Sequence, residues 1–300
     1  MAQVKYFCPI ILKNSRLKSF QISPDIELRK FVPTEREYFF GLKKVDFGFT
    51  TKFPLGFIGL NQFVASTKHK GRCPYSSLIT RGMVDGTSDI IASNYLIIIN
   101  MPEADRSVDI DRLNLLFKLL RATSTGIFLS FREGETGVGF HYPQAIHGPY
   151  DYLKLDSSDI KFLQNTYHLL QAGMDDRIKL CSELYARALI GDRSHLDVRF
   201  LLMVLALETL YLPKREQELG FRLRLYVAKS LGRSKDERMK IFEEVKNIYK
   251  VRSEIVHGGH AKKLTGEVFV GLTELVRKSI NLYLSRKDIF ADLEGTCLVG

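Results

Sequence analysis

The chain has 300 residues, of which 45% are hydrophobic and 26% are charged. This composition is typical of globular proteins and excludes a disordered or fibrous chain, and the length favours about two domains. The formal net charge of +10 favours acidic partners, with RNA, DNA and anionic surfaces as the candidate classes.

The cysteines and the apolar runs argue against a disulfide-rich, zinc-binding, secreted or membrane-spanning protein. The four cysteines are far apart, without a CxxC pair or a histidine at zinc-finger spacing, so we expect neither a disulfide framework nor a structural metal site. They are Cys8, Cys73, Cys181 and Cys297. The first apolar run is interrupted by Pro9 and lacks a small-residue cleavage site, so no signal peptide is expected. The longest apolar runs, 95–99 and 200–207, are too short to cross a membrane, which favours a cytoplasmic protein.

The first half of the chain, residues 1–150, has the pattern of a mixed α/β domain. Short β-branched and aromatic runs between Gly, Pro and Ser turns predict strands at 6–12, 95–100 and 127–132. The capping box Thr34–Glu37 predicts the start of a helix, and apolar residues on one face predict another from Asp109 to Arg121. No feature of this half indicates its role.

From Asp156 onward the pattern is helical throughout. The spacing of apolar residues and the capping residues predict helices at 157–171, 175–190, 196–212, 218–231, 234–257 and 265–286. The helix at 196–212 is apolar on nearly every side, so we expect it to be buried in the centre of a bundle. Gly232 is expected to end its helix in a left-handed conformation. The sequence therefore predicts an α+β protein, with a helical domain over 156–300 and a boundary at 149–156.

Arg252 is out of place on the helix predicted at 234–257. The apolar stripe of that helix runs through Ile241, Val245, Ile248 and Ile255 at spacings of three and four residues, and Arg252 takes one of its positions. A buried, unpaired guanidinium costs several kcal/mol. Arg252 must therefore meet a carboxylate, line a cleft or lie at a subunit interface, and a purely structural ion pair is an equally good interpretation.

Glu208 is the matching anomaly on the apolar helix before it. It is the only charged residue between Phe200 and Leu212, and a buried carboxylate also needs a partner. A Glu208–Arg252 pair satisfies both residues. The alternative is that Glu208 pairs with Arg222 or Arg224 on the intervening helix.

His257 lies at the predicted end of the same helix, five residues after Arg252. At about 3.6 residues per turn this spacing rotates the two side chains well apart, so they converge only if a second surface completes a site. The helix dipole favours the imidazolium form at this end. A simple capping role for His257 is the alternative.

The segment Arg252-Ser-Glu-Ile-Val-His257 resembles the signature of the HEPN superfamily. Its surroundings are similar to the Apea-like HEPN family in particular, where a central helix with an Ala-Leu-Glu step, here Ala206–Glu208, precedes a Tyr…Arg-Ser…Val-His-Gly block, here Tyr249–Gly258. The resemblance covers about residues 175–286. It implies an all-α bundle that forms a homodimer, in which two Arg/His motifs face one cleft.

The resemblance also implies an activity, because many such domains are metal-independent endoribonucleases of prokaryotic antiviral defence or toxin systems. RNA carries its own nucleophile, the 2′-OH. His257 can act as the general acid or base, and Arg252 can hold the scissile phosphate. Ser253 is placed to orient either group, with Glu208 and Tyr249 in support. No metal or cofactor is needed.

A non-catalytic role stays open beside this interpretation. A HEPN fold can serve as a module for RNA or nucleotide binding and for dimerisation, with the first half acting as the sensor. Residues 214–252 contain twelve Lys or Arg and six Asp or Glu. This excess indicates either an RNA-binding surface or solvated helix faces with ordinary ion pairs.

Overall fold

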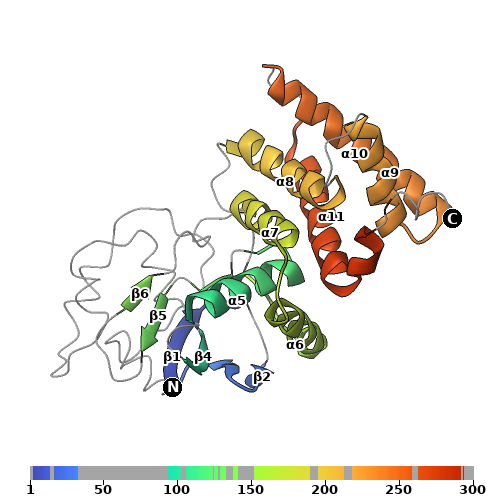
Figure 1. Ribbon diagram of the computed structural model, residues 1–300. Coiled ribbons are helices and arrows are strands. Elements are labelled where there is room, and N and C mark those ends of the chain that lie inside the picture. The colour runs from blue at the N-terminus through green and yellow to red at the C-terminus, as the bar shows by residue number, and fades with distance from the viewer. Residues whose placement is uncertain are drawn as a thin grey trace. The chain divides into compact units, whose positions relative to one another are not determined.

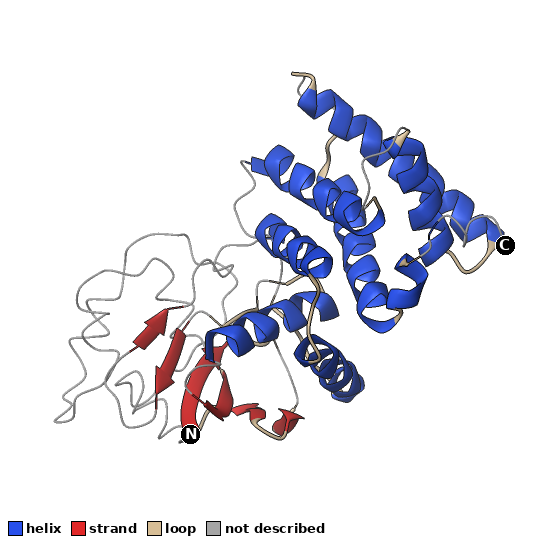
Figure 2. Cartoon of the chain, in the orientation of Figure 1, coloured by secondary structure: helices blue, strands red, loops and turns tan. Residues whose placement is uncertain are grey.

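The computed structural model describes residues 3–13, 17–32, 94–102, 106–123, 125–127, 129–132, 138–140, 152–189, 195–212, 218–258, 263–291 and 293. The chain divides into two compact units. Unit 1 comprises Met1–Asn114, Thr125–Ile146 and Tyr152–Gln164, and unit 2 comprises Leu115–Ser124, His147–Asp151 and Asn165–Gly300. An antiparallel sheet comes first in the chain and helices follow (Figures 1 and 2), which confirms the α+β class. Unit 2 also takes in residues 115–124, which precede the boundary expected at 149–156.

The sheet of unit 1 has the order β2-β3-β4-β1-β5-β6, and every neighbouring pair is antiparallel. Its strands are β1 (Gln3–Ile10), β2 (Ser19–Ser23), β3 (Ile26–Lys30), β4 (Tyr95–Pro102), β5 (Leu129–Arg132) and β6 (Val138–Phe140). Strand β1 is central, because it pairs along its whole length with β4 and on its other edge with β5. The strands predicted at 6–12, 95–100 and 127–132 are confirmed as β1, β4 and β5.

The core of unit 1 explains its longest apolar run. All five residues from Tyr95 to Ile99 are buried, so side chains on both faces of β4 are covered and its sequence shows no polar alternation. Helix α5 (Arg106–Leu120) confirms the helix predicted at 109–121. Asn114 on this helix exchanges two hydrogen bonds with the backbone of Ile127. The helix predicted after Thr34 lies outside the described residues.

Unit 2 is built from helices, and the predicted ones are confirmed within two residues at each end. They are α6 (Ser157–Gln171, in unit 2 from Asn165), α7 (Asp176–Leu189), α8 (Leu196–Tyr211), α9 (Leu219–Leu231), α10 (Lys235–Val256) and α11 (Gly266–Ser285). The short 3-10 helix η3 (Lys287–Phe290) follows them and was not predicted. Helix α8 contacts α7, α9, α10 and α11, so it is the central helix. None of the described helices is long and apolar enough to cross a membrane.

Helix α8 was predicted to be a buried central helix, and one of its faces is exposed. Phe200, Met203 and Leu207 are fully buried, but the side chains of Val198 and Leu205 are 52% and 43% exposed. These two residues are seven apart and share one face of the helix. The neighbouring helices cover only the rest of its circumference, and an apolar residue type alone cannot indicate which side is left open.

The ends of α9 and α10 show one confirmed and one corrected prediction. Ser234 caps α10 by accepting a hydrogen bond from the backbone N–H of Glu237. Gly232 is not left-handed, because its φ is −84°. Glycine is required there by close approach instead, since a Cβ atom would lie 2.6 Å from Cγ of Arg238. Gly258, which follows α10, does have a positive φ, at +89°.

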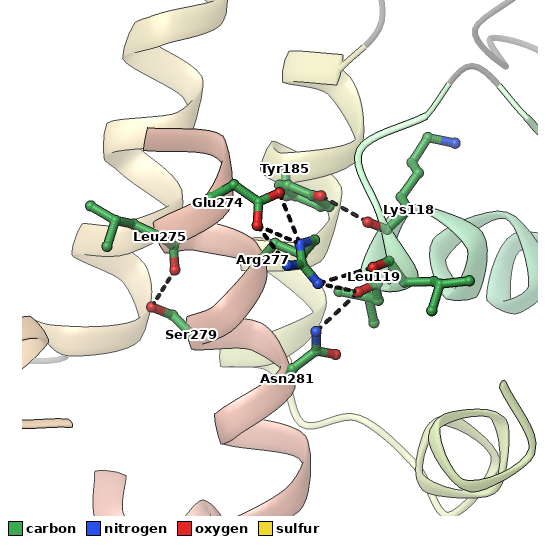
Figure 3. Close-up of polar contacts among 9 residues, drawn as sticks. Lys118, Leu119, Tyr185, Glu274, Leu275, Arg277, Ser279 and Asn281 are labelled. Atoms are coloured by element: carbon green, nitrogen blue, oxygen red, sulfur yellow. Dashed lines mark hydrogen bonds and ion pairs between the residues drawn. The ribbon is translucent and has the colours of Figure 1, made fainter. Parts of the chain in front are cut away.

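Within unit 2, α11 binds the C-terminal turn of α5 (Figure 3). Arg277 donates from Nη1 to the carbonyl oxygens of Leu119 and Leu120 and from Nε and Nη2 to Glu274. Asn281 donates to Leu119 as well, at 3.0 Å. The last carbonyls of a helix lack partners within the helix. Arg277 and Asn281 therefore satisfy polar groups that burial would otherwise leave unpaired.

Candidate functional site

Helix α10 carries the predicted site residues along its second half. Val245, Ile248 and Val251 are its buried side chains, whereas Ile255 is only half-buried. Val245 and Ile248 confirm the expected stripe, but its next buried position is Val251 instead of Arg252. Arg252 lies at the edge of this stripe, and 33% of its side chain is exposed. The edge position lets the guanidinium reach both a buried partner and solvent.

The structure brings Arg252 together with Glu208 of α8. Nε of Arg252 is 3.3 Å from Oε1 of Glu208, whose side chain is 17% exposed. The same carboxylate oxygen accepts a hydrogen bond of 2.6 Å from the hydroxyl of Tyr249. The predicted Glu208–Arg252 pair is confirmed, and among the described residues the side-chain partners of Glu208 are Arg252 and Tyr249 rather than Arg222 or Arg224.

Tyr249 fixes the other side of the arginine. The guanidinium carbon of Arg252 lies 5.3 Å from the centre of the Tyr249 ring, a cation–π distance. Burial, followed by the hydrogen bond to Glu208 and the charge of that carboxylate, raises the pKa of Tyr249, against a smaller opposing effect of Arg252. The phenol therefore stays neutral and keeps donating to Glu208. One acid and one ring hold Arg252 in a single orientation.

The first turn of α9 packs directly against this ring. A Cβ atom on Gly220 would lie 2.9 Å from Cδ1 and 3.0 Å from Cε1 of Tyr249, closer than a methyl group can approach a ring. Gly220 is therefore required by packing. Gly220 was not predicted from the sequence, where the only signal is a glycine inside a helix, which costs about 1 kcal/mol relative to alanine.

The guanidinium of Arg252 retains unused donors. Among the residues that the structure describes, its two Nη atoms have no hydrogen-bond partner, and Nε is the guanidinium nitrogen closest to Glu208. Two N–H groups side by side form the fork that binds two oxygens of a phosphate or carboxylate. Arg252 is thus held at one end and open at the other.

His257 and Ser253 lie apart from this cluster. His257 caps α10, and its backbone N–H donates to the carbonyl of Ser253 at 3.1 Å. Both side chains are exposed, and neither has a hydrogen-bond partner within the described part of the chain. Five residues correspond to a rotation of about 140° around the helix. Within one chain, therefore, His257 and Arg252 point in different directions.

The described residues contain no group of three or more His, Cys, Asp or Glu side chains able to hold a metal ion. Comparisons of the chain with protein-family models, with curated proteins and with solved structures found no match.

Proposed function

We propose that the helical unit is a HEPN-type, metal-independent endoribonuclease that acts as a homodimer in the cytoplasm, in prokaryotic defence or as a toxin. One observation carries the proposal. Arg252 pairs with Glu208, with Nε as its closest nitrogen, and lies against the Tyr249 ring, while its Nη atoms make no hydrogen bond to the described residues. The same helix ends five residues later at the exposed His257.

The free donors of Arg252 fit the charge that develops at phosphorus during RNA cleavage. The 2′-oxygen of the substrate attacks the adjacent phosphorus while a base removes its proton, and the bond from phosphorus to the 5′-oxygen breaks as that oxygen is protonated. The products are a 2′,3′-cyclic phosphate and a 5′-OH. Arg252 stabilises the added negative charge on the two non-bridging oxygens, and His257 serves as proton donor or acceptor.

Glu208 and Tyr249 act on Arg252 rather than on the substrate. The ion pair with Glu208 and the Tyr249 ring limit the rotation of the guanidinium. Restricting the arginine in advance lowers the entropy lost when phosphate binds. Partial neutralisation by Glu208 also makes the half-buried charge tolerable before substrate arrives.

The directions of the side chains support a site shared by two chains. Arg252 and His257 of one chain lie about 140° apart on the helix, so a second copy is needed to complete the constellation. A two-fold axis near the end of α10 brings two His257 residues to one cleft, because identical patches meet at an isologous interface. The reaction has two proton transfers, and two histidines can share them.

The dimer is tested by mixing two inactive variants. Arg252→Ala and His257→Ala subunits are unfolded together and refolded so that mixed dimers form. In a mixed dimer the surviving Arg252 and His257 come from different chains, and we expect part of the activity to return. No recovery in verified mixed dimers contradicts a composite site.

A non-catalytic RNA-binding and dimerisation module is the second candidate function. The specific observation in its favour is that Glu208 already neutralises Arg252, while His257 contacts neither residue. A structural ion pair would have the same geometry.

The discriminating experiment incubates labelled single-stranded RNA with the protein in EDTA. Wild type is compared with Arg252→Ala and His257→Ala. The matched controls are the exposed residues His168 on α6 and Arg233 before α10, each changed to alanine. We expect cleavage by the wild type and both controls and none by the two site variants. Equal cleavage by all five proteins, or none by any, contradicts the nuclease. RNA binding without cleavage that survives His257→Ala favours the second candidate.

A further inference from the structure

Helices α9 and α10 form an antiparallel pair. Gly220, at the start of α9, packs against Tyr249 near the end of α10, and Gly232, after α9, packs against Arg238 near the start of α10. The two helices lie side by side in Figures 1 and 2. A glycine at each of these two contacts allows the backbones to approach closely.

An aromatic surface, defined here as Phe221, Arg224 and Phe242, lies on this helix pair. The two rings are 6.0 Å apart and nearly perpendicular. The guanidinium carbon of Arg224 is 5.8 Å from the centre of the Phe221 ring and 5.5 Å from that of Phe242. Nε of Arg224 donates to the carbonyl of Gly220 at 2.8 Å. This bond holds the cation against both rings.

The aromatic surface is open to solvent to a degree that is unusual for phenylalanine. Phe221 is 48% exposed, although burying such a side chain stabilises a protein by about 1.5–3 kcal/mol. Exposed apolar side chains one turn away on the same two helices extend it. They are Leu225, four residues after Phe221, and Met239, three residues before Phe242. Exposed apolar side chains grouped in this way mark an interaction site.

The charge of α9 indicates the kind of partner. The helix contains Arg222, Arg224 and Lys229 and no acidic residue, in a chain of net charge +10. The partner must offer a flat apolar face together with negative charge. A second copy of this chain would bring the same positive helix against itself, which is unfavourable. An unpaired nucleotide has an apolar base face and an anionic phosphate.

The position of the aromatic surface relates it to the Arg252 cluster. Phe242 and Tyr249 are seven residues apart, so they lie on the same face of α10, two turns and about 10.5 Å apart. Phe221 is adjacent to Gly220, which contacts the Tyr249 ring. A strand whose phosphate lies at Arg252 therefore has a neighbouring base within reach of Phe221.

We infer that the aromatic surface binds an unpaired segment of RNA by stacking a base on Phe221, with Arg224 countering the adjacent phosphate. The inference deepens the proposed function by assigning the place where substrate is held beside the reacting phosphate. Stacking selects for base faces, which a duplex hides, and tolerates any base identity.

The test measures binding separately from cleavage. The full-length protein is titrated into fluorescein-labelled oligo-dT, which lacks the 2′-OH that the proposed reaction requires, and anisotropy gives the affinity. We expect Phe221→Ala to weaken binding by about 5- to 100-fold, the loss typical of one stacked base. Phe221→Trp should keep near wild-type affinity. The control Val270→Ala removes an equally exposed apolar side chain on α11 and should have no effect.

Further arms separate the other outcomes. The wild type should bind a blunt DNA duplex more weakly than oligo-dT. Wild-type affinity in Phe221→Ala overturns the inference, as does equal binding of duplex and single strand. Dissociation of a dimer by Phe221→Ala at unchanged affinity shows that a second copy covers the surface, which also overturns it. Phe221-dependent binding without RNA cleavage contradicts the nuclease alone, and cleavage without Phe221-dependent binding contradicts this inference alone.

Discussion

Arg252 and Arg277 lie in the same helical unit, and each is paired with a glutamate, yet their remaining donors differ. Arg277 uses Nε, Nη1 and Nη2, which donate to Glu274 and to two backbone carbonyls (Figure 3). Arg252 has one ion pair, with Nε closest to Glu208, and no hydrogen bond to the described residues. Arg277 joins two helices and satisfies their polar groups. Arg252 is held in place, but its Nη N–H groups have no hydrogen-bond partner among the described residues.

The comparison gives a criterion for separating a structural arginine from a functional one. Partial burial and an ion pair are common to both, so neither property identifies a site. A structural arginine uses its N–H donors in hydrogen bonds within the protein, because a buried donor without a partner lowers the stability of the fold. An arginine that is oriented by protein groups but open at its Nη edge is prepared for an external anion.

The largest expected effect is on cleavage by Arg252→Ala. Loss of a preorganised donor to the transition state should lower kcat by about 10²–10³-fold, and Arg252→Lys should recover only part of it, because an ammonium lacks the fork geometry. Arg277→Ala should cleave at a rate near that of the wild type below its melting temperature. Single-turnover cleavage rates measure all three. An equal loss in Arg252→Ala and Arg277→Ala would remove the distinction between them.

The second expected effect is on the free energy of unfolding, where Arg277→Ala should lose more than Arg252→Ala. Arg277→Ala leaves the carboxylate of Glu274 and the carbonyl of Leu120 without their donor, while the carbonyl of Leu119 keeps its hydrogen bond from Asn281. We expect the free energy of unfolding to fall by about 2–3 kcal/mol. Arg252→Ala should cost less than about 1 kcal/mol, because its ion pair is partly solvated. Urea titrations followed by circular dichroism give both values. A larger loss in Arg252→Ala than in Arg277→Ala would contradict the structural assignment.

A third prediction concerns the packing that holds Arg252 in place. Gly220→Ala puts a methyl group against the Tyr249 ring, which must shift, and such overpacking costs about 1–3 kcal/mol. We expect a lower cleavage rate, because the displaced Tyr249 ring no longer orients Arg252. The contacts of Arg277 should change less. Gly266→Ala is the matched control, because a Cβ there meets no atom within 4 Å. Cleavage at the wild-type rate in Gly220→Ala would show that the ring does not position Arg252.

The smallest expected effect is on the pH dependence of the free energy of unfolding. It comes from a second carboxylate–tyrosine cluster, in which Tyr283 donates a hydrogen bond to Asp175. Partial burial opposes ionisation of Asp175, but hydrogen bonds from Lys287, the backbone of Ile178 and Tyr283 outweigh it and lower its pKa to about 2 from 3.8. Because the native state favours the carboxylate, its stabilising contribution is full above about pH 4 and disappears as the pH falls to about 2.

Replacing the carboxylate isolates this contribution. Asp175→Asn should be less stable than the wild type near neutral pH, and the difference should shrink over that acid range. Unfolding curves at several pH values test it. A stability difference that stays constant between neutral pH and about pH 2 would contradict the role of the Asp175 charge.

The sequence predicted the Glu208–Arg252 pair because each is a charge on an otherwise apolar stripe, and two such charges need a partner. It also predicted the helix order, since the capping residues and the apolar spacing are local signals. Local sequence patterns could not predict the contacts that depend on how the helices pack. Gly220 against Tyr249 is one, and the close approach that requires glycine at position 232 is another.

The open face of α8 and the order of the strands have the same physical origin. Val198 and Leu205 are as apolar as their buried neighbours, so only the placement of other helices leaves them exposed. Strand β1 pairs with β4 across a long stretch of sequence, and no local pattern distinguishes that partner from others. The functional roles of Ser253 and His257 stay predictions, because they rest on residue type and resemblance.

The chemistry of the cleaved ends tests the central claim most directly. RNA digested by the wild type in EDTA is analysed by mass spectrometry, beside an RNA with a single 2′-deoxy substitution at the cleaved position. The proposed reaction predicts 2′,3′-cyclic phosphate and 5′-OH ends and complete protection by the substitution, since the 2′-OH is the nucleophile. Products with a 5′-phosphate, or cleavage at the 2′-deoxy position, would contradict it.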